Sequence, residues 1–273
     1  MNGYSSGRMS AMPPVVKNLL IINVAMFVLA YFVPLPNFNM AEKLSIYYFK
    51  SPNFRPYQIV THMFMHANFA HIFFNMFGLW MFGRVIESVW GSKRFFVLYF
   101  VAGIGAVALN EFVMWLQFNP VFQFAAEFIN NPTVNSFAGF ISHHGKYSGV
   151  EVNQFIQAWQ NDPSNQAYVT EAVNYIREIT VGINSSSMLG ASGAIFGVLA
   201  AFALLFPNVE LMLIFLPIPI KAKYFVPIYA VLELFLGVAN FSGDNIAHFA
   251  HLGGAIFGFF IALYWKKNQF KIY

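Results

Sequence analysis

Ser192 lies in the segment Gly190-Ala191-Ser192-Gly193, at the mouth of an apolar run that is long enough to enter a membrane. A serine hydroxyl becomes a nucleophile when a neighbouring base takes its proton, and the resulting oxyanion then needs hydrogen-bond donors. The same hydroxyl could instead bond back to its own helix, or the small residue could let two helices approach. Ser192 therefore indicates catalysis only if the rest of the chain supplies a base and oxyanion donors.

His251 is the candidate base. Each of the two residues precedes a stripe of small residues at a four-residue spacing, Gly193, Gly197 and Ala201 after the serine and Gly254, Gly258 and Ala262 after the histidine. Facing stripes of this kind let two helices pack backbone to backbone, which would bring Ser192 and His251 within hydrogen-bond reach. A histidine bonded to a backbone carbonyl for packing is the alternative. Because the sequence puts no obvious acidic partner near His251, we expect a Ser–His dyad rather than a triad.

His71 and Asn75 are the candidate oxyanion donors. They are four residues apart and so share one face of a helix. Two side-chain donors that point the same way, with the backbone N–H of Ser192 as a third, are what a tetrahedral oxyanion requires.

Four further ionisable residues in the apolar runs have roles that the sequence leaves open. His62 and His66 form a second pair four residues apart. The zinc-protease pattern needs a glutamate between two such histidines, and this sequence has none there. We therefore predict no metal and no other cofactor, and expect His66 to hold a loop through its ring. We interpret His248 as structural or interfacial. Glu233 is interpreted as structural, either bonded to a neighbouring helix or placed in a hydrated gap near the active site, with proton relay as the alternative.

The composition points to lipid as the solvent. Hydrophobic residues make up 58% of the 273 residues and charged residues only 10%, against about 25% charged in average soluble domains. A net charge of +4 does not suggest a nucleic-acid partner, and the absence of cysteine excludes disulfides, thiolate metal sites and a cysteine nucleophile.

The apolar runs predict an all-α integral membrane protein with six transmembrane helices. The expected spans are 15–33, 57–83, 95–115, 188–206, 224–241 and 247–265. Residues 28–30 resemble a signal-peptide cleavage site, but we interpret the first run as a retained span. We expect residues 84–94 to form a charged turn, and residues 211–220, which contain two prolines, to form a re-entrant or interfacial piece.

These spans divide the chain into four parts. Residues 1–14 are a cytoplasmic tail, and residues 15–115 hold the first three spans with a lateral loop at 34–56. Residues 116–187 are an extracytoplasmic insertion, with a helix expected at 167–180, and residues 188–273 hold the last three spans and a cytoplasmic C-terminal tail. Both termini are expected in the cytoplasm, because ten of the 15 Lys and Arg residues then lie on that side.

The motifs together resemble the rhomboid family of intramembrane serine proteases, in its bacterial six-span form. The resemblance rests on His71-x-x-x-Asn75, on Gly190-Ala191-Ser192-Gly193 and on Ala250-His251-Leu252-Gly253-Gly254-x-x-x-Gly258. It covers about two thirds of the chain. It departs from the family in lacking a Trp-Arg pair in the first loop, where Phe54-Arg55 is the nearest match, and in the length of the insertion.

The resemblance implies that Ser192 is the nucleophile and His251 the general base and acid. His71, Asn75 and the Ser192 amide would form the oxyanion hole, Gly190 would leave room for the substrate chain, and residues 224–246 would provide a movable gate and cap. The implied substrates are membrane proteins with a transmembrane helix, and the implied location is the bacterial cytoplasmic membrane.

Two other functions remain as alternatives. A catalytically silent relative would bind membrane helices without cutting them. The presence of all four candidate catalytic residues argues against it: Ser192, His251, His71 and Asn75. A transporter would use the histidines as a proton path, but transporters tend to show repeated halves, and we find none in this sequence. The sequence does not indicate an oligomeric state.

Overall fold

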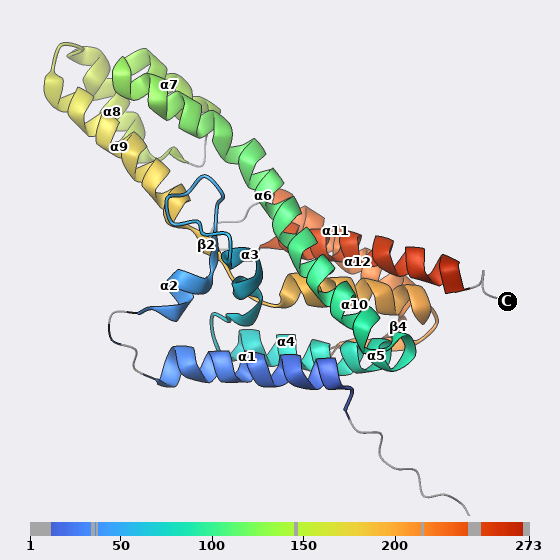
Figure 1. The fold of residues 1–273 in the computed structure, drawn as a ribbon. Helices are drawn as coiled ribbons and strands as arrows, with labels where there is room; N and C mark the ends of the chain where they lie inside the picture. The colour runs from blue at the N-terminus through green and yellow to red at the C-terminus, as the bar shows by residue number, and fades with distance from the viewer. Residues whose placement is uncertain are drawn as a thin grey trace, which may run out of the picture. The chain divides into compact units, whose positions relative to one another are not determined.

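A computed structural model describes residues 12–33, 36, 38–144, 147–213, 216–239 and 247–269. The chain divides into two compact units (Figure 1). Unit 1 comprises Met1–Ile46, Phe54–Glu111 and Ser187–Tyr273, and unit 2 comprises Tyr47–Asn53 and Phe112–Ser186. Most of the two expected tails, and the expected cap at 242–246, lie outside the described residues.

Helix α1 (Pro14–Phe32) is the first apolar run, and a proline at its first position suits the start of a helix. Its free N–H groups are bound by a side chain far along the sequence: the Glu87 carboxylate accepts from the amides of Val15 and Val16 at 3.0 and 2.8 Å. Glu87 is buried, so its charge meets the positive end of a helix dipole in an apolar setting.

The second apolar run is broken into several pieces, so the expectation of one helix over 57–83 is wrong. It contains α3 (Gln58–Thr61), the 3₁₀ turn η1 (His62–Phe64), α4 (Phe69–Gly78) and the π-helical segment η2 (Leu79–Gly83). Asn68 starts α4 by accepting the His71 amide at 2.8 Å. A side chain that accepts from the free backbone donors of a first turn caps the start of a helix. His62 lies in η1, whereas His66 lies in the loop between η1 and α4.

The charged turn expected at 84–94 is also largely helical. Helix α5 (Arg84–Trp90) continues directly from η2, and Gly91, with φ of 79°, ends it just before α6 (Ser92–Asn130). Helix α6 runs past the expected end at residue 115 and through Pro120.

Among the described residues, five helical stretches are long and apolar enough to cross a membrane. They are α1, Phe69–Trp90, α6, α11 (Ala222–Ala239) and His248–Asn268 within α12 (His248–Gln269). The run expected at 188–206 gives the shorter apolar helix α10 (Ser192–Leu205), because residues 187–188 form strand β2 (Ser187–Met188) and Gly190 takes a φ of 125°. The chain is thus a mainly helical membrane protein.

Helix α2 (Met40–Leu44) and several short strands follow or join these helices. Strand β2 pairs with β1 (Ile46–Tyr47). The piece expected to be re-entrant or interfacial at 211–220 is an antiparallel hairpin of β3 (Glu210–Leu213) and β4 (Leu216–Lys221), with Glu210 opposite Lys221.

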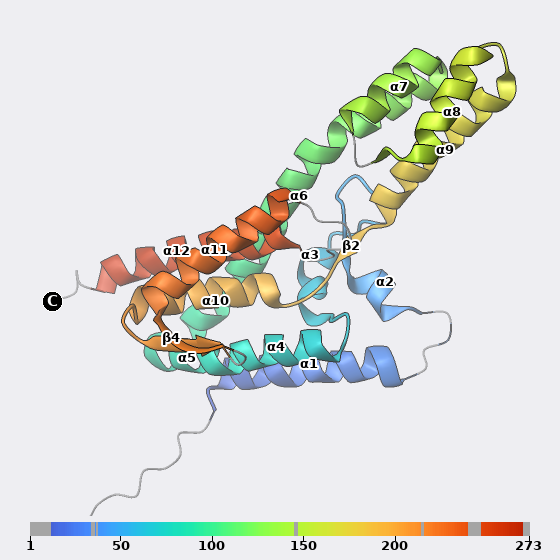
Figure 2. The same ribbon diagram turned by 180° about the vertical axis from the view of Figure 1, so that it is seen from behind.

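Helix α10 is the centre of unit 1. It contacts α4, η2 and α5 on one side and α11 and α12 on the other (Figures 1 and 2). Its contact with α12 is made between backbones: a Cβ on Gly254 would overlap the carbonyl group of Gly193, and a Cβ on Gly258 would overlap the backbone of Gly197. Helix α6 also leaves no room for a side chain on these glycines of α10. A Cβ on Gly193 would overlap Cβ of Ala106, and a Cβ on Gly197 would overlap Cβ of Ala102.

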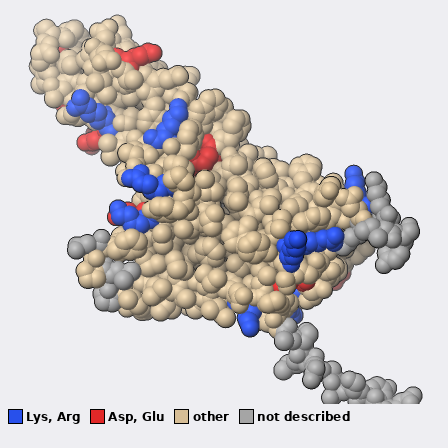
Figure 3. Space-filling model, in the orientation of Figure 1, with Lys and Arg blue, Asp and Glu red and all other residues tan. Residues whose placement is uncertain are grey.

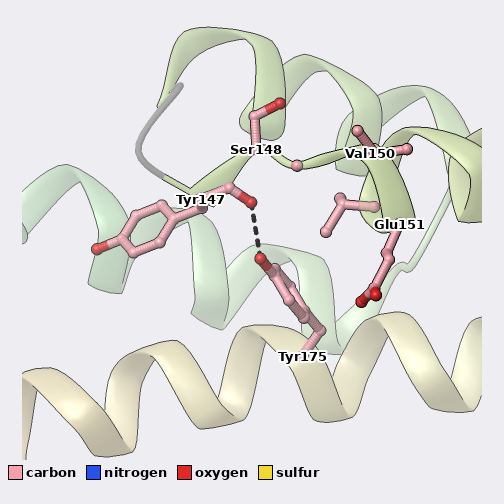
Figure 4. Close-up of a pocket in the computed structure, with 7 residues that line it drawn as sticks. Tyr147, Ser148, Val150, Glu151 and Tyr175 are labelled. Atoms are coloured by element: carbon pink, nitrogen blue, oxygen red, sulfur yellow. Dashed lines mark hydrogen bonds between the residues drawn. The ribbon is translucent and has the colours of Figure 1, made fainter. Parts of the chain in front are cut away.

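Unit 2 has a hydrophobic core of its own. It packs α7 (Val134–His143), α8 (Val150–Asn161) and α9 (Gln166–Ser185) with the second half of α6 around Phe128, Phe137, Trp159 and Ile176. The helix expected at 167–180 lies within α9. Near the start of α8, the Tyr175 hydroxyl donates to the Tyr147 carbonyl at 2.7 Å, beside an open pocket of about 400 Å³ (Figure 4). Burial, aided by the Glu178 carboxylate, raises the pKa of Tyr175.

The outer surface is suited to lipid. The face drawn in Figure 3 carries few charged side chains, and most of its area is neutral. In α11 more than half of the apolar side chains are exposed, including Ile228 at 63%, Val231 at 66% and Val238 at 71%. Exposed apolar area on this scale is expected where hydrocarbon rather than water surrounds a helix.

Gly254→Ala is predicted to destabilise unit 1, because the added methyl group meets backbone that cannot move without separating α10 from α12. We expect a loss of about 3 kcal/mol or more in the free energy of unfolding, seen as a lower Tm in detergent. Gly139→Ala, on an exposed position of α7 with no atom within 4 Å of the new Cβ, is the control and should gain up to about 1 kcal/mol. An unchanged Tm for Gly254→Ala would contradict the packing described here.

Candidate active site

Ser192 is the first residue of α10. The preceding residues are held in place by a hydrogen bond from the Gly190 amide to the His62 carbonyl at 2.9 Å. No side chain caps α10, so the first amides of the helix, including that of Ser192, have no acceptor within the helix. The hydroxyl therefore sits beside free N–H groups at the positive end of a helix dipole.

His251, in the first turn of α12, lies directly against Ser192. Its Nε2 is 2.8 Å from the Ser192 hydroxyl oxygen. The ring of Phe196, one turn after the serine, stacks on the imidazole with ring centres 4.3 Å apart and planes 6° from parallel. The glycine contacts between α10 and α12 bring the two helices close enough for this hydrogen bond.

A carboxylate lies on the other side of His251, so the expectation that this histidine has no acidic partner is wrong. Oε2 of Glu233, on α11, is 3.0 Å from Nδ1 of His251 and 2.6 Å from Nδ1 of His248. Glu233 and His248 are almost fully buried, at 4% and 5% side-chain exposure. Periodicity along α11 could not indicate this contact, because the acid and the two histidines belong to different helices.

His71 faces the same small volume as the serine. A Cβ built on Gly190 would lie 2.8 Å from Nε2 of His71 and 3.7 Å from the Ser192 hydroxyl oxygen, so only glycine fits between them. The Ala67 amide donates to Nδ1 of His71 at 3.3 Å. A neutral ring that accepts at Nδ1 carries its proton on Nε2, and this N–H is the one nearer Ser192.

Asn75 is buried on the same helix, but one of its N–H groups is used locally. Its side-chain amide donates to the His71 carbonyl at 2.8 Å. This bond leaves the second N–H of the amide, so Asn75 can serve as a donor to a bound group without breaking the first contact.

His62 and His66 differ in their contacts. His62 holds the loop by two contacts. Its carbonyl accepts a hydrogen bond from the Gly190 amide, and its ring nitrogen Nδ1 lies 2.9 Å from the Gln58 carbonyl oxygen. His66 is buried, and among the described residues neither of its ring nitrogens has a hydrogen-bond partner. Its ring packs edge-on against that of His71, with centres 5.2 Å apart. These contacts do not support the expectation that His66 holds a loop through its ring, which stays a prediction.

The described residues that could hold a metal ion are Glu233, His248 and His251, whose ligand atoms all lie within 4.8 Å of one another. Two histidines and one carboxylate are a ligand set used for zinc. Here the carboxylate accepts hydrogen bonds from both rings, so the protons of the two Nδ1–H groups occupy the place that a metal would take. Hydrogen bonding accounts for the arrangement, and the absence of a metal stays a prediction.

Comparison with known proteins identifies one protein family over much of the chain. The family model of the rhomboid domain matches residues 53–121 and 166–268, more than half of the chain, and these ranges include Ser192, His251, His71, Asn75 and Glu233. The unmatched stretch between the two ranges lies within unit 2.

Individual relatives carry the same family name. An uncharacterized mitochondrial rhomboid protein of Schizosaccharomyces pombe is 27% identical over 225 residues, which are 79% of this chain and 53% of that protein. The mitochondrial rhomboid protein 1 of Saccharomyces cerevisiae is 25% identical over 77% of this chain and 42% of its own length.

A shorter match, 38% identical over 53 residues, links the chain to the rhomboid protease GluP of Bacillus subtilis and covers 19% of this chain and 10% of that protein. The chain spans about half the length of the two yeast relatives. The matched domain and the relatives lead to one conclusion: this chain belongs to the rhomboid family.

Proposed function

We propose that this chain is an intramembrane serine endopeptidase that cleaves transmembrane or juxtamembrane segments of other membrane proteins. Family membership supports a protease of this type. The observation that carries the proposal is the 2.8 Å hydrogen bond between Ser192 and His251, made at the end of an apolar helix where a chemically idle polar pair would be costly.

The reaction follows from the contacts around this pair. The Ser192 oxygen attacks the scissile carbonyl carbon while Nε2 of His251 takes the hydroxyl proton. The Ser192 amide and the Nε2–H of His71 stabilise the tetrahedral oxyanion, with the free N–H of Asn75 as a third donor. His251 then returns the proton to the leaving amine. Water hydrolyses the acyl-enzyme by the same steps, which restores the serine.

The proposal includes the arrangement in the membrane. Six spans, with α10 as the short one, put both termini on one side and the insertion at 116–187 on the other. The excess of Lys and Arg on the side of the termini supports a cytoplasmic or equivalent location for them. The partners are the lipid bilayer and substrates with a transmembrane helix. Two of the relatives are called mitochondrial, which does not favour the bacterial cytoplasmic membrane; a third comes from a bacterium.

Ser192→Ala is predicted to abolish cleavage of a reporter with one transmembrane helix and a helix-breaking segment near its outer end. Loss of the nucleophile should lower kcat by at least about 10³-fold and remove labelling by a fluorophosphonate probe. The measurement is gel-based cleavage with purified protein in detergent and in proteoliposomes.

Three outcomes would contradict this function. Cleavage by Ser192→Ala would remove the serine mechanism. Wild-type protein that binds the reporter but neither cleaves it nor takes the probe would be a silent helix-binding relative. A pH-dependent flux through vesicles containing Ser192→Ala would indicate transport.

His71→Ala should lower kcat by about 10²- to 10³-fold with a small change in KM, since an oxyanion donor acts mainly in the transition state. Phe73→Ala, a half-exposed position on the same helix, is the matched control and should keep kcat within a few-fold of the wild type. Equal losses in the two variants would mean that α4 acts by packing alone.

The topology can be tested with single cysteines, since the natural chain has none. Ser164→Cys in the insertion and Lys267→Cys near the end of α12 are both exposed positions. A membrane-impermeant maleimide should label them from opposite faces of sealed vesicles, and the cysteine-free parent should stay unlabelled. Labelling of both from one face would refute the six-span arrangement.

A further inference from the structure

Glu233 is an acid in an unusual place. Of the described residues in α11, the buried ones are Ala222 and Glu233, while the other side chains are partly or fully exposed to the surroundings. A carboxylate that is 4% exposed on a helix of mostly apolar residues carries a large desolvation cost. It is tolerated only if hydrogen bonds compensate for the lost water.

The compensating hydrogen bonds come from the two histidines of α12. Both reach the same atom, Oε2, at 2.6 Å from His248 and 3.0 Å from His251. Since a carboxylate only accepts, each of these nitrogens must carry the proton of the bond. In a neutral His251 the proton is then on Nδ1, which leaves a lone pair on Nε2, the atom that is 2.8 Å from the Ser192 hydroxyl.

We propose that Glu233 is a positioning residue that completes a Ser192–His251–Glu233 triad, with His248 holding the carboxylate in place. This inference rests on the proposed function. Glu233 selects the tautomer in which His251 can accept the serine proton, and it stabilises the imidazolium that forms when the proton moves. The histidine leaves that state when it gives the proton to the leaving amine, so the carboxylate itself need not change protonation.

The charge balance favours this role. With two neutral rings the cluster carries one negative charge, and transfer of the serine proton to His251 makes an ion pair at 3.0 Å inside an apolar environment. An ion pair that forms only in the transition state lowers the barrier. The pair of helices α10 and α12 is fixed by glycine packing, whereas the acid is supplied by a third helix, α11.

The titratable groups that surround His251 in the described part of the chain limit what a pH profile will report. They are Glu233 from α11, His248 from the same helix, and His71 from α4, which interacts with His251 electrostatically. Tyr229, on α11, lies beside Glu233.

The test is Glu233→Gln in the full-length protein, which keeps the size of the side chain and removes its charge. We expect kcat on the transmembrane reporter to fall by roughly 10²- to 10⁴-fold with little change in KM, as for the corresponding substitution in soluble serine proteases. The acid limb of the pH profile of kcat/KM should change, because His251 loses its anionic partner. Glu233→Asp should restore part of kcat.

Glu87→Gln is the matched structural control. Glu87 is also a buried carboxylate that accepts several hydrogen bonds, but its partners are the amides at the start of α1 and the Ser92 hydroxyl. This variant should lower Tm and leave the pH profile of the active fraction unchanged. Should Glu233→Gln fail to fold, the comparison of Glu233→Asp with the wild type, by kcat and pH profile, tests the same point.

Distinct results would overturn the inference and the function. Wild-type kcat and pH profile in Glu233→Gln, with Ser192→Ala inactive, would leave a dyad protease and remove the triad. Loss of wild-type activity on chelation, restored by Zn²⁺, would make the three residues metal ligands and also remove the triad. Persistent cleavage by Ser192→Ala would instead refute the proposed function itself.

Discussion

The backbone contact between α10 and α12 is the constraint on which the rest of the structure depends. Gly193 and Gly197 meet Gly254 and Gly258 with no room for a side chain. In lipid, helices gain little from burying apolar surface against one another, so close packing of small residues is a main source of their association. The same contact sets the separation of Ser192 and His251, and thus links stability directly to chemistry.

Around this contact, the polar groups near the serine are joined to one another rather than to water. The hydroxyl, the imidazole and the Glu233 carboxylate form one chain of hydrogen bonds from α10 through α12 to α11. Each bond is stronger in a medium of low dielectric constant, and each unpaired group would be more costly there. His66 is the exception: its two buried nitrogens lack partners among the described residues, and its ring instead supports His71.

Unit 2 is built by different rules from unit 1. Its helices α8 and α9 have an apolar face on a shared core and polar residues elsewhere, as in soluble domains. Residues 122–165, which belong to it, lie between the two ranges that the rhomboid family model matches. Unit 2 thus has a core of its own, and Ser192 and His251 belong to unit 1.

The residues with chemistry could be found in the sequence because each lies in a local pattern. The small-residue stripes after Ser192 and His251, and the four-residue spacing of His71 and Asn75, are properties of single helices and are visible without a structure. Hydropathy likewise identified a helical membrane protein, because the lipid environment requires long apolar segments whatever their tertiary contacts.

What local patterns could not indicate was decided by contacts across the chain. The helix break between His62 and His71 depends on Asn68, which caps α4. The late start of α10 depends on the hydrogen bond that the Gly190 amide donates to the His62 carbonyl. The partner of His251 lies 18 residues away on a neighbouring helix, in a run where Glu233 looked isolated. By itself the sequence determined that this is a helical membrane protein and which groups are candidates for chemistry. The tertiary structure alone decided which of those groups meet, since hydrogen bonds between helices depend on packing and not on spacing within one helix.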